Sequence, residues 1–290
     1  MALDRRQHAF RPDLADARLR DAVQAAEYVT GSPARIKVGR SPALRAPEAS
    51  APVETCYHYG ERVLVFEVED SFCWCQSLRD GYVAYVPSPD VDLTPSSGAG
   101  GASPYVTNMG CFAYAEPDLR SRVVDFLPRR STVALKEART QTRGTTYVES
   151  IDGLHVPERC LASGDSYVRD LVENAARYLG APYLWGGRSF LGLDCSALVQ
   201  NAFEDANVVV PRDSDLQASS IGAEISPADA SGLERNDLLF LPGHVVIYDG
   251  AGSVIHADGS SMMVVKEPLA KLAERRSLAM SDFRIRRPRL

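Results

Sequence analysis

The fold of the C-terminal part of the chain is decided by Asp194-Cys195-Ser196-Ala197-Leu198-Val199-Gln200-Asn201-Ala202-Phe203. Counted from Cys195, its apolar residues recur at i, i+3, i+4, i+7 and i+8, a spacing that predicts an amphipathic helix. Asp194 is a favourable N-cap residue, because its side chain can accept hydrogen bonds from the first free backbone N–H groups. We therefore expect Cys195 in the first turn of a helix.

This position gives Cys195 a possible chemical role. The positive end of the helix dipole favours a thiolate and is expected to hold the pKa of the thiol below its free value of about 8.5. The same backbone N–H groups can hold a developing oxyanion. The alternative is structural, since a free cysteine is among the residue types most often buried.

Two histidines follow on a predicted hairpin. Residues 237–241 form an apolar strand, Pro242-Gly243 a turn, and residues 244–248 and 253–257 the two strands of the hairpin. With an odd number of loop residues, His244 lies opposite His256, and their side chains share one face of the sheet. A slip of one residue would place them on opposite faces.

A thiol, a histidine that deprotonates it and a second group that orients the histidine are the requirements of nucleophilic cysteine catalysis. Cys195 would be the nucleophile, His244 the base and acid, and His256 the orienting residue. Two other interpretations stay open at this point. The histidines can be ordinary core residues, or the three side chains can form a Cys/His/His zinc site.

The remaining elements are read from periodicity and turn residues. Residues 166–183 predict a helix that stops near Gly180. Residues 13–28 predict a short helix that packs on a later domain. Between them, strands are expected in two β-rich stretches, at 36–38, 62–68, 72–77 and 82–86 in the first, and at 123–126, 132–136 and 147–150 in the second.

The first β-rich stretch suggests a small closed barrel, and the second a degenerate copy of it. Residues 94–101, TPSSGAGG, are expected to form a flexible linker between the two.

Composition excludes several classes of protein. The chain has 290 residues, of which 24% are charged, a globular balance that argues against wholesale disorder. Its net charge of −6 argues against a general nucleic-acid binder. No apolar run reaches the length of a membrane span. Residues 1–20 carry no secretory signal, so we expect a cytoplasmic protein with its six cysteines as free thiols.

Several of these residues form motifs of a known family. Tyr183-x-Trp185-Gly186-Gly187, Asp194-Cys195-Ser196, Gly243-His244-Val245-x-Ile247-Tyr248 and Ile255-His256-Ala257 resemble the NlpC-type branch of papain-like cysteine peptidases, over residues 165–260. Ala197 stands where that family usually has Gly. Tyr59-Gly60-Glu61 and residues 80–85 resemble bacterial SH3-like domains.

The resemblance implies an α+β chain in which a papain-like catalytic domain follows two small SH3-like β-barrels. The expected division is an N-terminal helical segment at 1–28, the first barrel at 29–93, the linker and second barrel at 94–161, and the peptidase domain at 162–290. Members with two SH3-like domains resemble γ-D-glutamyl-L-diamino acid endopeptidases, which cut murein peptides and favour a free N-terminal L-Ala. This implies a role in cell-wall peptide recycling, with either meso-diaminopimelate or Lys after D-Glu.

The resemblance also implies roles for individual residues. Tyr183 is assigned to the oxyanion region, and the substrate contacts are Trp185, Asp213, Ser214 and, at the border of the site, Ser196. Tyr82 is expected to complete the pocket from the first barrel. Tyr85, Glu54 and Glu61 are further candidates there. A carboxylate such as Asp213 suits a cationic α-amino group.

The mechanism needs no metal or organic cofactor, and the expected partner is a murein peptide rather than nucleic acid. Two other functions stay open. One is an amidase or acyltransferase on the same papain-like scaffold. The other is a non-catalytic protein that binds through its SH3-like domains.

Overall fold

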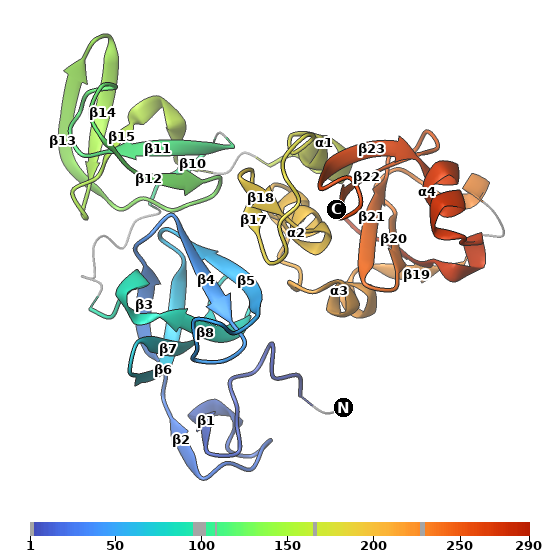
Figure 1. Cartoon of the computed structure of the whole chain (residues 1–290), viewed down its shortest axis with the longest axis horizontal. Coiled ribbons are helices and arrows are strands. Elements are labelled where there is room, and N and C mark those ends of the chain that lie inside the picture. Colours follow the sequence, from blue (N-terminus) through green and yellow to red (C-terminus); the bar gives the residue numbers. More distant parts are fainter. Residues whose placement is uncertain (1–2, 95–102, 108, 165–166, 227–229) are drawn as a thin grey trace. The chain divides into compact units, whose positions relative to one another are not determined.

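The computed structural model describes residues 3–94, 103–107, 109–164, 167–226 and 230–290. It divides into an N-terminal unit, Met1–Asp165, and a C-terminal unit, Ser166–Leu290 (Figure 1). Strands dominate the first unit, whereas the second combines strands with helices. The expected α+β class is therefore confirmed. Of the expected linker, residues 95–101 lie outside the described residues.

The first β module, residues 32–92, is a seven-stranded antiparallel sheet in the order β5-β4-β8-β7-β6-β3-β9. Its strands are β3 (Ser32–Ile36), β4 (Arg40–Leu44), β5 (Val53–His58), β6 (Arg62–Glu69), β7 (Phe72–Ser77), β8 (Val83–Pro87) and β9 (Val91–Asp92). The β6 and β7 strands match the predicted bounds closely. Among the described residues β5 and β9 are the edges of the ladder, so the expected closed barrel is not formed.

The second β module, residues 105–162, repeats this topology. Its strands are β10 (Tyr105–Val106), β11 (Gly110–Tyr114), β12 (Val123–Pro128), β13 (Leu135–Thr142), β14 (Thr145–Ser150), β15 (His155–Pro157) and β16 (Leu161–Ala162). The order β12-β11-β15-β14-β13 matches β5-β4-β8-β7-β6, and β10 pairs with β16 as β3 pairs with β9.

The backbone hydrogen bonds also repeat, 70 residues apart. The Lys37 N–H donates to the carbonyl of Asp90 at 3.0 Å, and the Thr107 N–H donates to that of Cys160 at 2.9 Å. Gly60 turns the chain at φ 78°, and Arg130 does so at φ 65° in the second module. A Cβ at position 60 would lie 2.0 Å from the carbonyl oxygen of Thr132, so only glycine fits there. The described strands and turns of the second module therefore repeat those of the first.

The predicted helix over residues 13–28 is wrong. These residues form β1 (Leu14–Asp16), a short 3₁₀ turn at Ala17–Leu19 and β2 (Glu27–Val29), which pairs in parallel with β1. Leu14 is buried with Phe66 and Trp74 of the first module. Isolated helices of this length are marginal, and the contact with the module favours the extended form instead.

The C-terminal unit is built on a six-stranded antiparallel sheet in the order β19-β24-β20-β21-β22-β23. Its strands are β19 (Ala223–Ile225), β20 (Leu238–Leu241), β21 (His244–Tyr248), β22 (Ser253–Asp258), β23 (Met263–Pro268) and β24 (Arg284–Arg287), with a small hairpin of β17 (Arg188–Ser189) and β18 (Gly192–Leu193). Its helices are α1 (Leu171–Ala176), α2 (Cys195–Glu204), α3 (Ser214–Ser220) and α4 (Leu269–Arg276).

Helices α1 and α2 pack against β21 and β22, at the middle of the sheet (Figure 1). The helix predicted over 166–183 is shorter than expected. Asp170 caps α1 by accepting hydrogen bonds from the N–H groups of Val172 and Glu173, at 3.0 and 3.2 Å, so the helix begins only at Leu171.

Candidate active site

Cys195 is the first residue of α2, as the sequence predicted. The Asp194 carboxylate caps the helix, since Oδ1 accepts a hydrogen bond from the Ala197 N–H at 2.9 Å. Cys195 is buried, with 7% of its surface exposed, and Ala197 is fully buried behind it. The start of α2 therefore holds the thiol beside the central strands of the sheet.

His244 and His256 lie in hydrogen-bond contact. The Nε2 atom of His244 is 2.8 Å from Nδ1 of His256, and both rings are buried. The register of β21 and β22 differs from the prediction, which placed His244 directly opposite His256. Ile247 lies opposite Ile255, so the two histidines are two residues away from direct opposition. An offset of two residues keeps side chains on the same face, so the rings still meet.

The Cys195 thiol lies near the strand residue that follows His244. The backbone N–H groups of Val245 and Ser196 are near enough to the thiol to act to lower its pKa. Burial and the Asp194 carboxylate act more strongly in the opposite direction and raise the pKa of Cys195 to about 11. The expectation that the helix N-terminus holds this pKa below its free value is therefore wrong, since burial and the Asp194 charge outweigh the backbone N–H groups.

The two imidazoles are also held in their neutral forms. Burial and the neighbouring His256 lower the pKa of His244 to about 3. Burial likewise lowers the pKa of His256, opposed by its hydrogen bond to Glu267. The resting site is thus a neutral thiol beside a neutral imidazole, in which His244 is free to accept a proton.

Glu267 is a site residue that the sequence reasoning missed. Its Oε1 atom lies 3.1 Å from Nε2 of His256. It belongs to the next strand, β23, where His256 lies opposite Val265 and Glu267 is two residues further on the same face. Side chains alternate between the two faces along β23, but this places Glu267 beside His256 only once the register of β22 and β23 is known.

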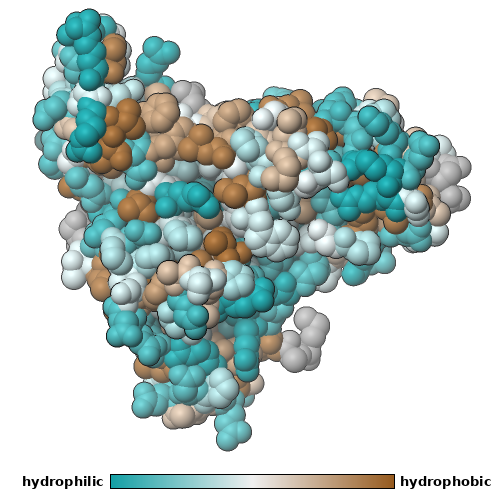
Figure 2. All heavy atoms as spheres, in the orientation of Figure 1, coloured by the Kyte–Doolittle hydropathy of each residue, from teal (hydrophilic) through white to brown (hydrophobic). Residues whose placement is uncertain are grey.

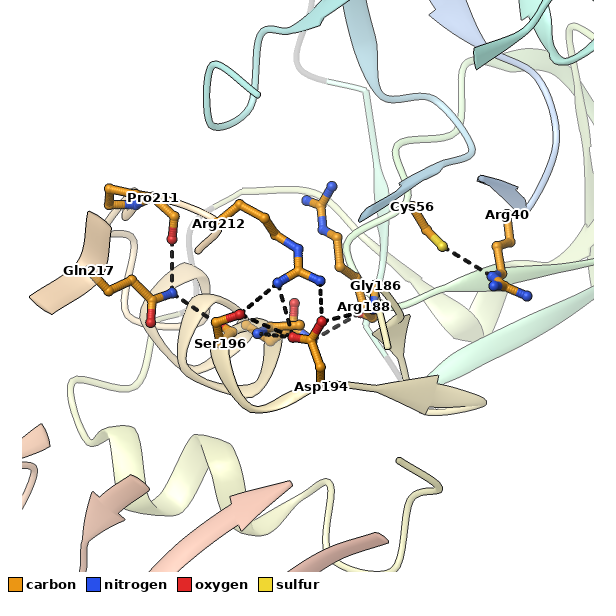
Figure 3. Close-up of polar contacts among 11 residues, drawn as sticks. Arg40, Cys56, Gly186, Arg188, Asp194, Ser196, Pro211, Arg212 and Gln217 are labelled. Atoms are coloured by element: carbon orange, nitrogen blue, oxygen red, sulfur yellow. Dashed lines mark hydrogen bonds and ion pairs between the residues drawn. The ribbon is translucent and has the colours of Figure 1, made fainter. Parts of the chain in front are cut away.

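A buried ion pair supports the start of α2 (Figure 3). Arg212 donates to both carboxylate oxygens of Asp194, at 3.0 and 2.6 Å, and to the Ser196 hydroxyl at 2.8 Å. The Gly186 N–H also donates to Asp194, at 2.9 Å. The Ser196 side chain, expected to border the substrate, is thus engaged in this cluster.

Tyr183 is electrostatically coupled to the thiol. Burial, together with the nearby Cys195 and Asp194, raises the pKa of its phenol to about 12. The side chain thus stays protonated and able to donate a hydrogen bond. Trp185, two residues further along, is 65% exposed on the surface of the same unit.

Asp213 and Ser214 lie at the start of α3. Asp213 takes the N-cap position of this helix without a hydrogen bond from its side chain to the helix backbone. Its carbonyl accepts from the Gln217 N–H at 2.9 Å, and the Gln217 amide donates to the Ser196 carbonyl at 3.0 Å (Figure 3). The segment 211–214 is thereby joined to the helix that carries Cys195.

The candidate residues of the first module lie in the N-terminal unit. Tyr82, Tyr85 and Glu54 line one cavity of about 520 Å³, together with Trp74 and several arginines. Glu61 does not line this cavity. Its carboxylate is buried and accepts hydrogen bonds within the module from the Ser77 hydroxyl at 2.6 Å and the His58 N–H at 3.1 Å.

The described part of the chain contains no group of three or more His, Cys, Asp or Glu side chains arranged to hold a metal ion. The zinc alternative therefore receives no support from the geometry of those residues. None of the helices in the described ranges has the length and apolar content needed to cross a membrane.

A cysteine at a helix start, packed against a sheet that carries paired histidines, defines a papain-like domain of the cysteine-peptidase class. Comparison with known proteins identifies two domains in the chain. Residues 180–280 match the NlpC/P60 family, and residues 44–91 match the bacterial dipeptidyl-peptidase SH3 domain. The chain therefore contains an NlpC/P60 domain preceded by an SH3-like domain, as the sequence motifs indicated.

Curated relatives match part of the chain. Dipeptidyl-peptidase 6 of Lysinibacillus sphaericus is 36% identical over 32% of this chain and 33% of its own length. Peptidoglycan endopeptidase RipB of Mycobacterium tuberculosis is 35% identical over 38% of this chain and 51% of its own length. Gamma-D-glutamyl-L-lysine dipeptidyl-peptidase of Bacillus subtilis is 30% identical over 39% of this chain and 38% of its own length. The chain thus spans between a third and about half of these relatives.

A solved structure shares the fold over most of the chain. The crystal structure of an NlpC/P60 family protein from Bacillus cereus has a TM-score of 0.70 at 19% identity, covering 88% of this chain and 99% of that one. At this identity the likeness establishes the fold. The predicted papain-like domain and SH3-like domain are confirmed.

Proposed function

We propose that the protein is a cysteine peptidase that hydrolyses the bond between the γ-carboxyl of D-Glu and an L-diamino acid in murein peptides. The observation that carries this is the 2.8 Å contact of His244 with His256. Val245, the residue after His244, has its N–H near the Cys195 thiol at the start of α2. Relatives named for γ-D-glutamyl-L-lysine and peptidoglycan hydrolysis support the substrate class.

The chemistry is acyl transfer in two steps. The sulfur of Cys195 attacks the γ-glutamyl carbonyl carbon while His244 takes the thiol proton, which forms a tetrahedral intermediate. The C–N bond then breaks, His244 protonates the leaving amine, and a thioester remains. Water, deprotonated by His244, attacks the thioester, and the proton returns to the sulfur as the D-Glu acid leaves.

The developing oxyanion needs hydrogen-bond donors in place before the attack. We assign this role to the Cys195 N–H at the start of α2 and to the Tyr183 hydroxyl, which the raised pKa keeps protonated. We assign substrate contacts to Trp185, Asp213 and Ser214, with Ser196 at their border. A free L-Ala amino group paired with Asp213 fits a role in recycling murein peptides.

Hydrolysis of L-Ala-γ-D-Glu-meso-diaminopimelate and of its N-acetylated form tests the proposal, followed by chromatography of the products. Cys195→Ala should abolish cleavage, whereas the matched control Cys160→Ala, a cysteine of the second module, should cleave normally. Cleavage of the free-amine peptide alone supports a site in which Asp213 binds the substrate's amino group. Equal cleavage of both peptides would mean that Asp213 does not contribute to substrate specificity. Products transferred to an added amine rather than to water would indicate the acyltransferase, and no cleavage of either peptide overturns the proposal.

A further inference from the structure

The histidine pair continues into a third and a fourth side chain. His256 on β22 is fully buried, and its Nε2 atom contacts Glu267 on the neighbouring strand β23 at 3.1 Å (Figure 1). The Arg275 guanidinium, on α4, forms an ion pair with the same oxygen of Glu267. The polar contacts thus run from His244 through His256 and Glu267 to Arg275.

These contacts fix where the protons lie. A carboxylate only accepts hydrogen bonds, so Nε2 of a neutral His256 must carry the proton that it donates to Glu267. Nδ1 of His256 then holds a lone pair and accepts from Nε2–H of His244 across 2.8 Å. The remaining nitrogen of His244, Nδ1, is left unprotonated, as a base must be before it takes a proton from a thiol.

We propose that Glu267 is a positioning residue, which sets the tautomers of both histidines and thereby turns Nδ1 of His244 into the base. The inference rests on the proposed function for its kinetic consequence, but the tautomers themselves do not depend on it. Without this acceptor, His256 can carry its proton on Nδ1 and face His244 as a donor. His244 would then hold its own proton on Nδ1 and could not deprotonate Cys195.

Two arginines of α4 lie close to Glu267 and to its neighbour Asp258. Arg275 pairs with Glu267 and also donates to Asp258 at 3.2 Å. Arg276 lies 3.6 Å from Asp258, on the same end of α4. The two arginines thus face the two carboxylates around the buried His256. Removal of the Glu267 charge would leave Arg275 with Asp258 as its partner.

The direct test is the tautomeric state of the histidines in solution, from long-range ¹H–¹⁵N correlation spectra of the imidazoles. The chain has only five histidines, so His244→Asn and His256→Asn variants assign the signals. We expect the wild-type protein to carry the proton on Nε2 in both His244 and His256. A proton on Nδ1 of either ring would overturn the proposal without any variant of Glu267.

Variants then connect the tautomers to the rate. Glu267→Ala should shift His256 toward the Nδ1–H form and lower kcat about 10- to 100-fold, with KM within about twofold, because a wrong tautomer disables the base. Glu267→Gln keeps an oxygen that can accept the hydrogen bond from His256. This variant should keep the wild-type tautomers and most of the activity that Glu267→Ala loses. The control Glu224→Ala removes an exposed carboxylate paired with Arg284 and Arg286, and it should change neither readout.

A purely structural role predicts a different pattern. Glu267→Ala would then lower the melting temperature while the folded protein kept its imidazole spectrum and its kcat, which would refute the proposal. If the wild-type protein cleaves no murein peptide, the proposed function fails, but the imidazole spectra still decide the role of Glu267.

Discussion

The Arg212 guanidinium binds both carboxylate oxygens of Asp194, at 3.0 and 2.6 Å, with 1% of the Arg212 side chain exposed. Asp194 is also the N-cap of the helix that begins with Cys195. Arg212 therefore balances the negative charge that lies nearest the thiol. The two residues have opposite effects on the pKa of Cys195, which Asp194 raises and Arg212 lowers.

Replacement of Arg212 by Met should be strongly destabilising, since it leaves the buried Asp194 without its partner. Loss of one member of a buried ion pair costs about 3–5 kcal/mol. Any folded fraction should show a still higher pKa of the Cys195 thiol. The free energy of unfolding in urea, and the pH dependence of alkylation by iodoacetamide, measure the two effects.

Arg235→Met is the matched control for this variant. Arg235 pairs with Asp170 at 2.8 Å in the same unit, but 46% of its side chain is exposed. Such pairs contribute at most about 1 kcal/mol. Equal losses of stability in the two variants would show that the Arg212 pair is no more important than a surface pair.

The lowered pKa of His244 predicts a stability that depends on pH. The imidazole titrates near 6.5 in the unfolded chain and near 3 in the folded one, so between these values the unfolded chain binds the extra proton. The contribution of neutral His244 is fully present above pH 6.5 and is lost as the pH falls toward 3. The free energy of unfolding should fall by at most about 1.4 kcal/mol per pH unit from this group.

The variant His244→Asn tests this pH dependence of stability. The control is His155→Asn, which replaces a histidine of the second β module. Denaturation in urea at several pH values between 3 and 7 should give a shallower slope for His244→Asn only. Parallel slopes in both variants and the wild type would mean that His244 does not resist protonation in the fold.

Local signals were enough to predict the parts of the site that lie within one element. The N-cap Asp194 and the apolar spacing after Cys195 place the thiol at a helix start, and the structure agrees. The turn at Pro242-Gly243 likewise marks the hairpin of β20 and β21. These features depend on hydrogen bonds between near neighbours, which residue type and spacing encode directly.

Features that depend on distant contacts were not predicted. Residues 14–16 and 27–29 form paired strands rather than a helix, and Leu14 packs on the first module, a contact that periodicity alone does not show. The register of β21 and β22 differs by two residues from the expected one, and Glu267 reaches His256 only through the pairing of β22 with β23. The sheet brings these residues together from separate strands, so their spacing along the chain carries little information.

The two β modules should unfold as one cooperative unit, because Arg35 joins them. Its guanidinium binds Asp152 of the second module at 2.5 and 2.8 Å and Asp92 of its own module at 2.8 Å. Arg35→Met should lower the stability by about 1.5–3 kcal/mol, the range for a hydrogen bond to a charged group. Urea denaturation measures this loss.

Arg139→Met, which removes an exposed pair with Glu158 inside the second module, is the control and should cost less than about 1 kcal/mol. A loss no larger in Arg35→Met than in Arg139→Met would mean that the modules are held together by other contacts.

The Tyr183 hydroxyl is expected to act in the transition state rather than in substrate binding. Because burial and the neighbouring Cys195 raise its pKa to about 12, it donates a hydrogen bond throughout the neutral range. Tyr183→Phe should lower kcat about 100-fold, the usual effect of removing one oxyanion donor, and leave KM nearly unchanged. Tyr248→Phe removes a hydroxyl that accepts from the Gly252 N–H on the same sheet and should cost stability but not rate. If Tyr183→Phe instead raised KM and left kcat unchanged, the hydroxyl would contribute to substrate binding and not to stabilisation of the transition state.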